Sequence, residues 1–307
     1  MKMPRLIIYI IFNLFYLNFS FAYEKNDNTS CKWENRSQIP CIEITSLLPN
    51  SSDFSKSGIN KTIITKKQIE ETGAVDLIDV LKSLPDINIT QSGPKGQQAS
   101  MFMRGTGSNH TLVMINGVAI NDQSTTQGLH DFGVDFIQTI QQVEVYPGSS
   151  AAHFGTNAIG GAVNIILTGD YKDSFLLASD NSANYELYGN KALIYDDSSL
   201  NIKIGSVQNE TISARGSSSD EKDGLKNYST NINYEKFFNE KLRFYNTVYL
   251  RQTKAEYDDS NTNQTGYEGN NKMGSLQFGL ENQIGSQKDN YIFYYNVYDR
   301  KYDERGT

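Results

Sequence analysis

MFMRGTGSNHTLVMING, residues 101–117, is the stretch that decides the fold, because it sets short β runs on either side of glycine-rich turns. Its second run, Thr111–Ile115, leads into Asn116-Gly117, a dipeptide typical of two-residue hairpin turns. The pattern continues in VEV at 143–145 and FGTNAIGGAVNII at 154–166. Since glycine permits tight turns and close approach of backbones, residues 61–168 are predicted to form one mixed α/β domain.

This domain is predicted to begin with a strand and a helix. Thr62–Thr65 has the composition of a short strand, and Lys67–Ser83 places apolar residues at near-helical spacing before Pro85 ends the pattern. Further short strands are predicted at Ser100–Arg104, Thr111–Ile115, Val118–Ile120, Val143–Tyr146 and Ala162–Leu167.

The second half of the chain shows long alternation with a period of two. In Lys241–Thr253 one face is largely apolar and the other polar or aromatic, as lipid on one side and water on the other would require. Similar alternation occurs at Leu200–Val207 and Tyr291–Tyr298. A soluble antiparallel sandwich alternates as well. The length of the strands and the polar loops at Ser217–Asp223 and Asp258–Asn271 favour a transmembrane β-barrel.

The composition agrees with a membrane β-barrel and argues against a nucleic-acid-binding protein. The chain carries 28 basic and 35 acidic residues, a net charge of -7, which argues against binding to nucleic acid. Its mean hydropathy of -0.51 is low, but a membrane barrel keeps a low average because lipid-facing and lumen-facing residues alternate.

The first residues have the parts of a secretory signal. Lys2 and Arg5 precede an apolar run, Leu6–Phe19, and Ser20-Phe21-Ala22 supplies small residues for cleavage, so residues 1–22 are predicted to be a signal peptide. The run is shorter than the roughly 20 residues that a spanning helix needs. Export places Cys31 and Cys41 in oxidising surroundings, where a disulfide is more plausible than a metal site.

The assembled order of motifs, from about Ile63 to Leu167, resembles the plug domain of TonB-dependent outer-membrane receptors. This resemblance implies a plug inside a closed barrel of about 22 antiparallel strands. In it, Arg104 and Glu144 are candidates for charge pairs within the plug or between plug and barrel. The residues that carry the plug's structure are Arg104, Gly105, Asn116, Gly117, Glu144, Gly155, Gly160 and Gly161.

The chain departs from the family pattern after the strand that contains Glu144. Members usually have a basic residue and then Gly-Pro there, whereas this chain has Tyr146-Pro147-Gly148. A buried arginine contact usual in the family is therefore absent at this position. Asn116 also replaces the commoner aspartate.

Residues 23–60 are predicted to be a flexible periplasmic arm, because they are polar with only scattered apolar positions. Within it, a pentapeptide resembles a TonB box, the extended segment that the inner-membrane-energised TonB protein binds as an added strand. Its residues are Ile42, Glu43, Ile44, Thr45 and Ser46.

Within the family, the chain resembles cobalamin receptors at Gly96-Gln97, Ser100, Phe102, Arg104-Gly105-Thr106, Ser108 and His110. The resemblance implies that Ser92–Ala99 and Asn121–Gly128 face the outside and contact cargo. Their neutral polar side chains offer hydrogen-bond donors and acceptors that suit an amide-rich ligand such as cobalamin, although a ferric siderophore or haem receptor could use the same types. The candidate binding residues are Ser92, Gln97, Gln98, Asn121, Gln123 and Ser124.

Cobalamin receptors also hold calcium in acidic loops, which makes Asp220, Asp223, Asp258 and Asp259 candidate ligands for a structural calcium ion. No other metal or cofactor is expected. His110, His130 and His153 are too scattered for a metal site, and Asp131-Phe132-Gly133 lacks the other motifs of a kinase.

The predicted protein is thus a monomeric, non-enzymatic receptor for uptake of a scarce nutrient, exported to the bacterial outer membrane. Residues 169–307 have room for about seven strands of roughly 20 residues with their loops, so they are predicted to be the N-terminal part of an incomplete barrel. Two alternatives remain: a non-transporting surface protein with the same barrel, and an exported soluble enzyme with a β-sandwich.

Overall fold

The structure is a computed structural model that describes residues 61–93, 95–125, 127–148, 151, 154–169, 171–180, 184–212, 222–258, 265–284 and 287–304. By its internal contacts the chain divides into Met1–Cys41 and Ile42–Thr307, and every described residue lies in the second unit. The predicted signal peptide, arm and TonB box lie outside the described residues. Among the described helices, none is long and apolar enough to cross a membrane.

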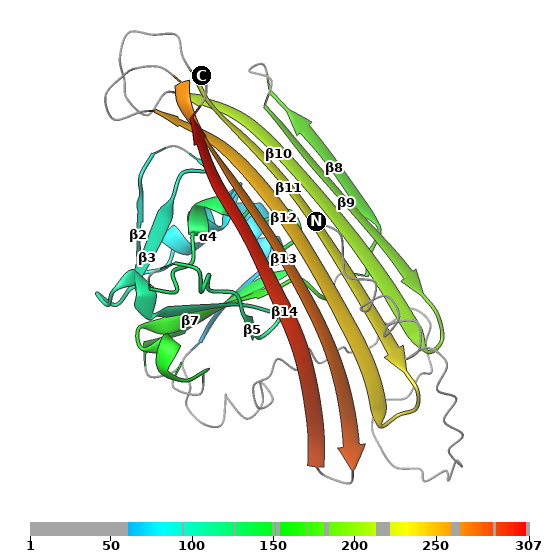
Figure 1. The fold of residues 1–307 in the computed structure, drawn as a ribbon. Helices are drawn as coiled ribbons and strands as arrows, with labels where there is room; N and C mark the ends of the chain where they lie inside the picture. The colour runs from blue at the N-terminus through cyan, green and yellow to red at the C-terminus, as the bar shows by residue number, and fades with distance from the viewer. Residues whose placement is uncertain are drawn as a thin grey trace. The chain divides into compact units, whose positions relative to one another are not determined.

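Residues 61–169, called the plug domain after the family that their sequence resembles, form a mixed α/β unit (Figure 1). The unit is built on a five-stranded sheet with the order β1-β6-β7-β4-β5. In it β4 and β7 run parallel, while the other neighbours pair antiparallel. A separate hairpin is made by β2 and β3. The strands are β1 (Thr62–Thr65), β2 (Ile87–Gln91), β3 (Ala99–Met103), β4 (Thr111–Ile115), β5 (Val118–Ala119), β6 (Gln142–Pro147) and β7 (Gly161–Ile166). The strands predicted from sequence are confirmed to within one residue at each end.

The single helix predicted at Lys67–Ser83 is wrong, because the chain forms two helices there. The first, α3 (Lys66–Thr72), ends at Gly73, whose φ of 67° is the left-handed conformation that glycine adopts without strain. The second, α4 (Leu77–Lys82), starts anew with Asp76 as N-cap, its side chain accepting the Asp79 N–H at 2.8 Å. The apolar residues of Lys67–Ser83 therefore keep their near-helical spacing across the break between α3 and α4.

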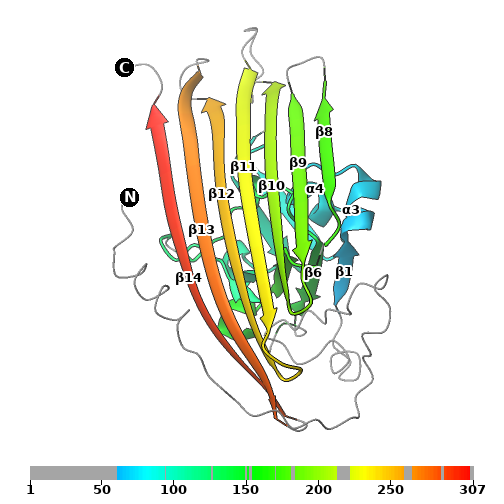
Figure 2. The ribbon, with the colours of Figure 1, turned by 90° about the vertical axis from the view of Figure 1, so that its right-hand side faces the viewer.

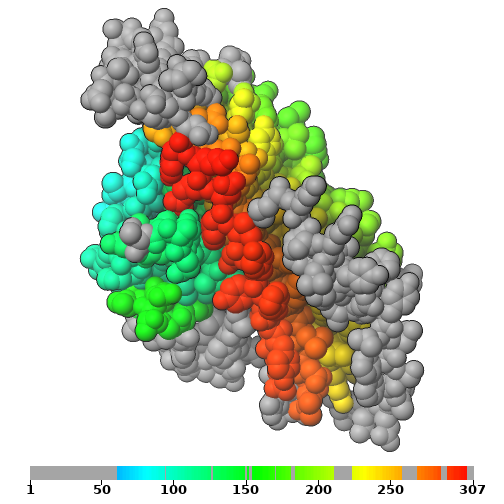
Figure 3. All heavy atoms as spheres, in the orientation of Figure 1, coloured from blue at the N-terminus to red at the C-terminus, as the bar shows by residue number. Residues whose placement is uncertain are grey.

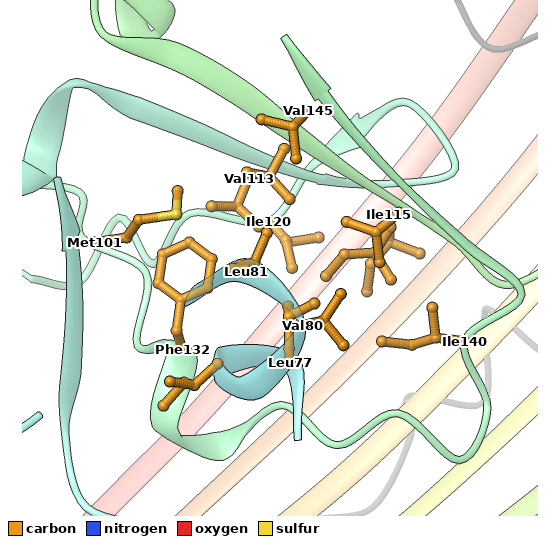
Figure 4. Packing of buried hydrophobic residues seen from close by; sticks show 14 of the residues in the cluster. Leu77, Val80, Leu81, Met101, Val113, Ile115, Ile120, Phe132, Ile140 and Val145 are labelled. Carbon is orange, nitrogen blue, oxygen red and sulfur yellow. The ribbon is translucent and has the colours of Figure 1, made fainter. Parts of the chain in front are cut away.

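The core of the plug domain lies between α4 and the five-stranded sheet. Figure 4 shows Leu77, Val80 and Leu81 of α4 packed with Val113 and Ile115 of β4. All five side chains of β4 are buried, since both faces of this central strand are covered. Short 3-10 helices in the described part of the domain include η1 (Ser108–His110), η2 (Phe132–Val134) and η4 (Thr156–Ala158).

The turn between β4 and β5 has the geometry that its sequence predicts. Asn116 and Gly117 have φ of 48° and 81°, so both central residues of the two-residue turn are left-handed. The Asn116 Oδ1 accepts the Leu167 N–H at 2.9 Å, which joins the turn to the end of β7. An asparagine is thus used here for its left-handed preference and its local hydrogen bond.

The second half forms one seven-stranded antiparallel sheet, here called the wall sheet, with the order β14-β13-β12-β11-β10-β9-β8 (Figure 2). The sheet is open, with β8 and β14 at its edges among the described residues. Its strands are β8 (Ser174–Ser179), β9 (Tyr185–Ile194), β10 (Ser198–Ile212), β11 (Lys222–Phe237), β12 (Leu242–Asp258), β13 (Thr265–Ile284) and β14 (Gln287–Glu304). The predicted fold class and number of strands are confirmed.

The alternation predicted for β12 is confirmed, because the side chains on its two faces differ in burial. Thr247 and Arg251 are buried against the plug domain, whereas Leu250 on the other face is 51% exposed. The predicted polar loops at Ser217–Asp223 and Asp258–Asn271 are too long, because β11 begins at Lys222 and β13 begins at Thr265. Hydrogen bonding between neighbouring strands extends β11 and β13 into segments whose polar composition is typical of loops.

The connections of the wall sheet differ at its two ends. At one end, residues 195–197, 238–241 and 285–286 join successive strands, and this is the short-turn end. At the other, residues 180–184, 213–221 and 259–264 make longer connections, and this is the long-loop end. In outer-membrane barrels short turns face the periplasm and longer loops the outside, so the two ends have a predicted orientation.

Candidate cargo site and plug–wall interface

The first predicted cargo loop is the tip of the β2–β3 hairpin and lies at the long-loop end. Gln97 donates from Nε2 to the Glu256 carbonyl at 2.6 Å, near the end of β12. Gly96 packs so closely on the wall that a Cβ atom there would lie 2.5 Å from Cδ1 of Leu225. Ser92 and Gln98 are exposed. The loop therefore offers a free polar edge while its base is fixed to the wall.

Lys95 anchors the same loop to the start of α4. Its Nζ lies 3.1 Å from Asp76 Oδ2 and 2.6 Å from Asp79 Oδ2. Partial burial raises the pKa of Asp79, but the Lys95 hydrogen bond and charge, together with the Val75 N–H, outweigh it and hold that pKa below its ordinary value. The hairpin tip is thus tied by charge to the helix beneath it.

The second predicted cargo loop is closed by Asn121. This side chain is buried, accepts the Val113 N–H at 2.8 Å and donates to the carbonyls of Thr111 and Gly128 at 3.1 and 3.0 Å. Its amide is therefore occupied in shaping the loop. Gln123, by contrast, is exposed.

Asp122 anchors this second loop to the wall sheet. Its Oδ1 accepts the Ser124 N–H at 2.9 Å, and its Oδ2 lies 2.8 Å from Nη2 of Arg300 on β14. Ser124 itself is exposed at the tip. Figure 3 shows the atoms of the plug domain directly beside the red atoms of β14, in agreement with this contact.

The six candidate cargo residues thus fall into two groups. Four of them present exposed side chains near the long-loop end, namely Ser92, Gln98, Gln123 and Ser124. Gln97 and Asn121 are not exposed and form hydrogen bonds inside the protein. Of the exposed residues, Ser124 donates to Asp122 Oδ1 at 2.6 Å and Gln123 donates to the Asn121 carbonyl at 3.5 Å. Their role in holding cargo stays a prediction.

The interface also contains a buried ion pair that sequence reasoning missed. Asp135 of the plug domain pairs with Arg251 of β12, and their side chains are only 6% and 2% exposed. His130 Nε2 lies 2.5 Å from the other oxygen of Asp135. Burial raises the pKa of Asp135, but Arg251 and His130 outweigh it and hold that pKa below its ordinary value. Only the alternation of β12, which turns Arg251 inward, could have signalled this pair.

Further side-chain hydrogen bonds join the wall to backbone carbonyls of the plug domain. Gln277 donates to the Ile115 carbonyl at 3.0 Å. Lys203 donates to the Leu167 carbonyl, and Asn296 donates to the Ala119 carbonyl, each at 2.8 Å. Tyr298 donates to the Ile120 carbonyl. These contacts satisfy polar groups at strand ends that the interface would otherwise bury unpaired.

The two charged residues predicted to structure the plug make their pairs inside it. Arg104 lies 3.2 Å from Asp86, at an exposed position. Glu144 accepts hydrogen bonds from the Tyr146 hydroxyl at 2.9 Å and from Asn164 at 3.0 Å, and Lys61 lies 3.4 Å away.

The departure at position 146 has a visible consequence. Burial, together with the adjacent Glu144, raises the pKa of Tyr146 far above its ordinary range. The phenol therefore stays protonated and can donate to Glu144. Tyr146 thus gives the carboxylate a neutral partner in the stretch where the family usually has a basic residue.

The predicted structural glycines serve different needs. Gly105 and Gly155 have positive φ in open space. At Gly160 a Cβ atom would lie 2.1 Å from Oγ1 of Thr106, and at Gly161 it would lie 2.0 Å from Sδ of Met103. The paired glycines at the start of β7 are therefore required by close packing.

The candidate calcium ligands are only partly described. Asp220 and Asp259 lie outside the described residues, while Asp258 ends β12 and Asp223 is a buried residue of β11. Within the described part of the chain, no group of three or more His, Cys, Asp or Glu side chains is placed to hold a metal ion.

Comparison with known proteins identifies the first domain. The family described as TonB-dependent Receptor Plug Domain matches residues 54–162. A vitamin B12 transporter, BtuB of Vibrio vulnificus (strain YJ016), is 42% identical over 104 residues, which are 34% of this chain and 17% of that protein.

Solved structures agree in fold. The siderophore receptor PirA of Acinetobacter baumannii superposes with a TM-score of 0.60 at 18% identity, covering 81% of this chain and 41% of PirA. The ferric-catecholate import receptor Fiu of E. coli K12 gives a TM-score of 0.62 at 15% identity, with 80% and 39% covered. The chain thus spans about two fifths of each receptor's length. Residues 54–162 therefore match the plug-domain family of the TonB-dependent receptors, and the strands that follow are similar in fold to those of the solved receptors.

Proposed function

We propose that this chain belongs to a receptor that takes up a scarce nutrient across the bacterial outer membrane by TonB-dependent active transport. The observation that carries the proposal is the plug domain held against a barrel-like wall, with two polar loops at the long-loop end. Their exposed Ser92, Gln98, Gln123 and Ser124 offer donors and acceptors to a ligand arriving from outside.

The mechanism proposed is transport by tight binding followed by forced release. A nanomolar complex represents about 12 kcal/mol of binding free energy, so release into the periplasm requires outside work or a remodelled site. TonB would supply that work by binding Ile42–Ser46 as an added strand. The mechanism requires no nucleophile, general base or redox cofactor, and we propose that the protein is not an enzyme.

Cobalamin is the cargo that we propose. The 42% identity to a vitamin B12 transporter falls on 104 residues, the part of the chain that supplies both loops. The exposed side chains of those loops are neutral, which suits a large amide-rich ligand better than a strongly anionic one.

A ferric siderophore is the second candidate. The solved receptors similar in fold include siderophore and ferric-catecholate receptors, but at 15–18% identity they support the barrel architecture and not the cargo. Haem is a third member of the same class of cargo.

An uptake assay tests the proposal. The complete receptor is expressed in a bacterium that lacks its own cobalamin receptor, and accumulation of radiolabelled cyanocobalamin is measured with and without TonB. Uptake that depends on both the receptor and TonB is expected. Binding to cells without TonB-dependent accumulation would instead indicate a non-transporting surface protein.

A further inference from the structure

One seven-residue segment of the plug domain, His130–Phe136, contacts both the candidate cargo loop and the wall sheet. It contains η2, and Phe132 points into the same core as Met101 and Leu81 (Figure 4). The segment is thus held on several sides. Neither predicted cargo loop includes any of its residues.

On the loop side, Asp131 and Gly133 set the backbone of the first cargo loop. Asp131 Oδ1 accepts the Ala99 N–H and the Gly133 N–H, each at 3.0 Å. A Cβ atom on Gly133 would lie 1.9 Å from the Gln97 carbonyl oxygen, so only glycine permits the observed approach. The position of Gln97 therefore depends directly on these two residues.

On the wall side, the next residues dock the segment. The Val134 carbonyl accepts from Thr253 Oγ1 at 3.2 Å and Asn227 Nδ2 at 3.3 Å. Asp135 pairs with Arg251, and Phe136 packs in an apolar cluster of wall residues. The apolar partners of Phe136 in the wall are Val207, Leu225 and Ala255.

The same segment is braced from within the plug domain. The Leu77 N–H at the start of α4 donates to the Asp135 carbonyl at 3.0 Å. Asp76 and Phe136 form an isolated β-bridge. Because the segment is fixed to both α4 and the wall, a shift of the hairpin tip relative to it would break the Asp131 and Gln97 contacts first.

We infer that Asp131 and Gly133 are positioning residues for cargo recognition, which hold the Ser92–Ala99 loop in its binding conformation from a base that Asp135 fixes to the wall. The inference rests on the proposed function, since it concerns how the proposed cargo loop is held. Neither residue needs to touch cargo. Cargo affinity is therefore sensitive to side chains behind the loop as well as to those on its edge.

A pair of glycine substitutions tests the steric part. Gly133→Ala would force the Gln97 carbonyl to move, whereas Gly274→Ala on β13 meets only Leu250 at 3.5 Å and serves as the matched control. A spin label is placed at Gln98→Cys in the complete receptor with Cys31 and Cys41 replaced by serine. The label spectrum is expected to change with Gly133→Ala and to stay that of the parent with Gly274→Ala.

A second pair tests the hydrogen bonds. Asp131→Ala removes the acceptor for two backbone N–H groups, whereas Asp131→Asn keeps an Oδ1 acceptor. Burial raises the pKa of Asp131, opposed by those two hydrogen bonds, so a neutral amide suits the site. Cyanocobalamin Kd is expected to rise about tenfold with Asp131→Ala and to recover with Asp131→Asn.

The outcomes separate this inference from the function on which it rests. If the parent receptor binds no cyanocobalamin, the proposed cargo fails, and the spin-label spectra still decide whether Asp131 and Gly133 set the loop. Unchanged spectra in Gly133→Ala and Asp131→Ala overturn the inference. An altered spectrum with unchanged cyanocobalamin Kd overturns it as well, because the loop would then move without affecting recognition.

Discussion

Arg251 of β12 and Asp135 of the plug domain form an ion pair whose side chains are 2% and 6% exposed. A pair this deeply buried loses most of its hydration, so each charge depends on the other. Since the two residues come from different parts of the fold, the pair ties the plug domain to the wall. Asp135 belongs to the segment His130–Phe136, in which Asp131 holds the backbone of the first cargo loop.

Removing one partner of this pair is expected to destabilise the docked plug strongly. Arg251→Met leaves Asp135 buried without its main counter-charge, which should lower the free energy of unfolding by about 3–5 kcal/mol. Arg104→Gln removes a pair with side chains 45% and 44% exposed, and its loss should be at most about 1 kcal/mol. Thermal unfolding in detergent measures both. Equal losses would contradict a special role for Asp135–Arg251.

The stability of the docked plug should fall in acid through the same carboxyl group. The pKa of Asp135 is held below its ordinary value of 3.8, so the stability it adds is present above that value and lost as pH falls through the folded pKa. Asp135→Asn should therefore flatten the acid side of a stability profile measured from about pH 7 to about pH 3. If Asp135→Asn loses stability in acid as the parent does, other carboxyl groups cause the acid sensitivity.

Two glycines that both have positive φ should respond differently to alanine. At Gly161 (φ 149°) a Cβ atom would lie 2.0 Å from Met103 Sδ and 2.6 Å from the Tyr146 carbonyl oxygen, whereas at Gly105 (φ 77°) no heavy atom lies within 4 Å. We expect Gly161→Ala to cost about 3 kcal/mol or to prevent folding, and Gly105→Ala to cost about 1 kcal/mol. Similar effects would show that backbone strain, and not packing, selects glycine at position 161.

The outer face of the wall sheet should meet lipid. Leu250 is 51% exposed on that face, and Leu250→Arg should cost about 2–4 kcal/mol if the position lies near the middle of the bilayer. Gln252→Arg, two residues closer to the long-loop end on the same face, should cost less than Leu250→Arg. Heat-modified mobility of the complete receptor in outer-membrane vesicles reports folding. Neutral behaviour of Leu250→Arg would favour an outer face in water, as in a soluble sandwich.

Much of the fold could be predicted because its signals are local. Period-two alternation fixed the inward face of β12, and Asn116-Gly117 fixed a hairpin turn. The helix at Lys67–Ser83 was predicted incorrectly because hydrophobic spacing outweighed Gly73, which ends α3 in a left-handed conformation. Strand ends in the wall were underestimated because pairing with a neighbour extends a strand through polar residues.

The interface could not be predicted to the same degree, since it depends on contacts between residues far apart in the chain. Arg251 and Asp135 are separated by 116 positions, and nothing near Asp135 marks it as half of an ion pair. Asn121 and Gln123 are both amide residues of the same loop, yet in the fold Asn121 is buried and Gln123 is exposed. Residue type predicted that these loop side chains are polar, but only the fold shows which of them are exposed.

The most direct test is calorimetric binding of cyanocobalamin to the complete receptor in detergent, beside a panel of ferric siderophores and haem, with and without calcium. Nanomolar binding of cyanocobalamin is predicted, weakened by Gln98→Ala or Gln123→Ala at the loop tips and unchanged by Gln252→Ala on the outer face of β12. Absence of cyanocobalamin binding, with a siderophore or haem bound tightly instead, would contradict the cargo. Binding of none of these ligands would contradict the proposal of a nutrient receptor.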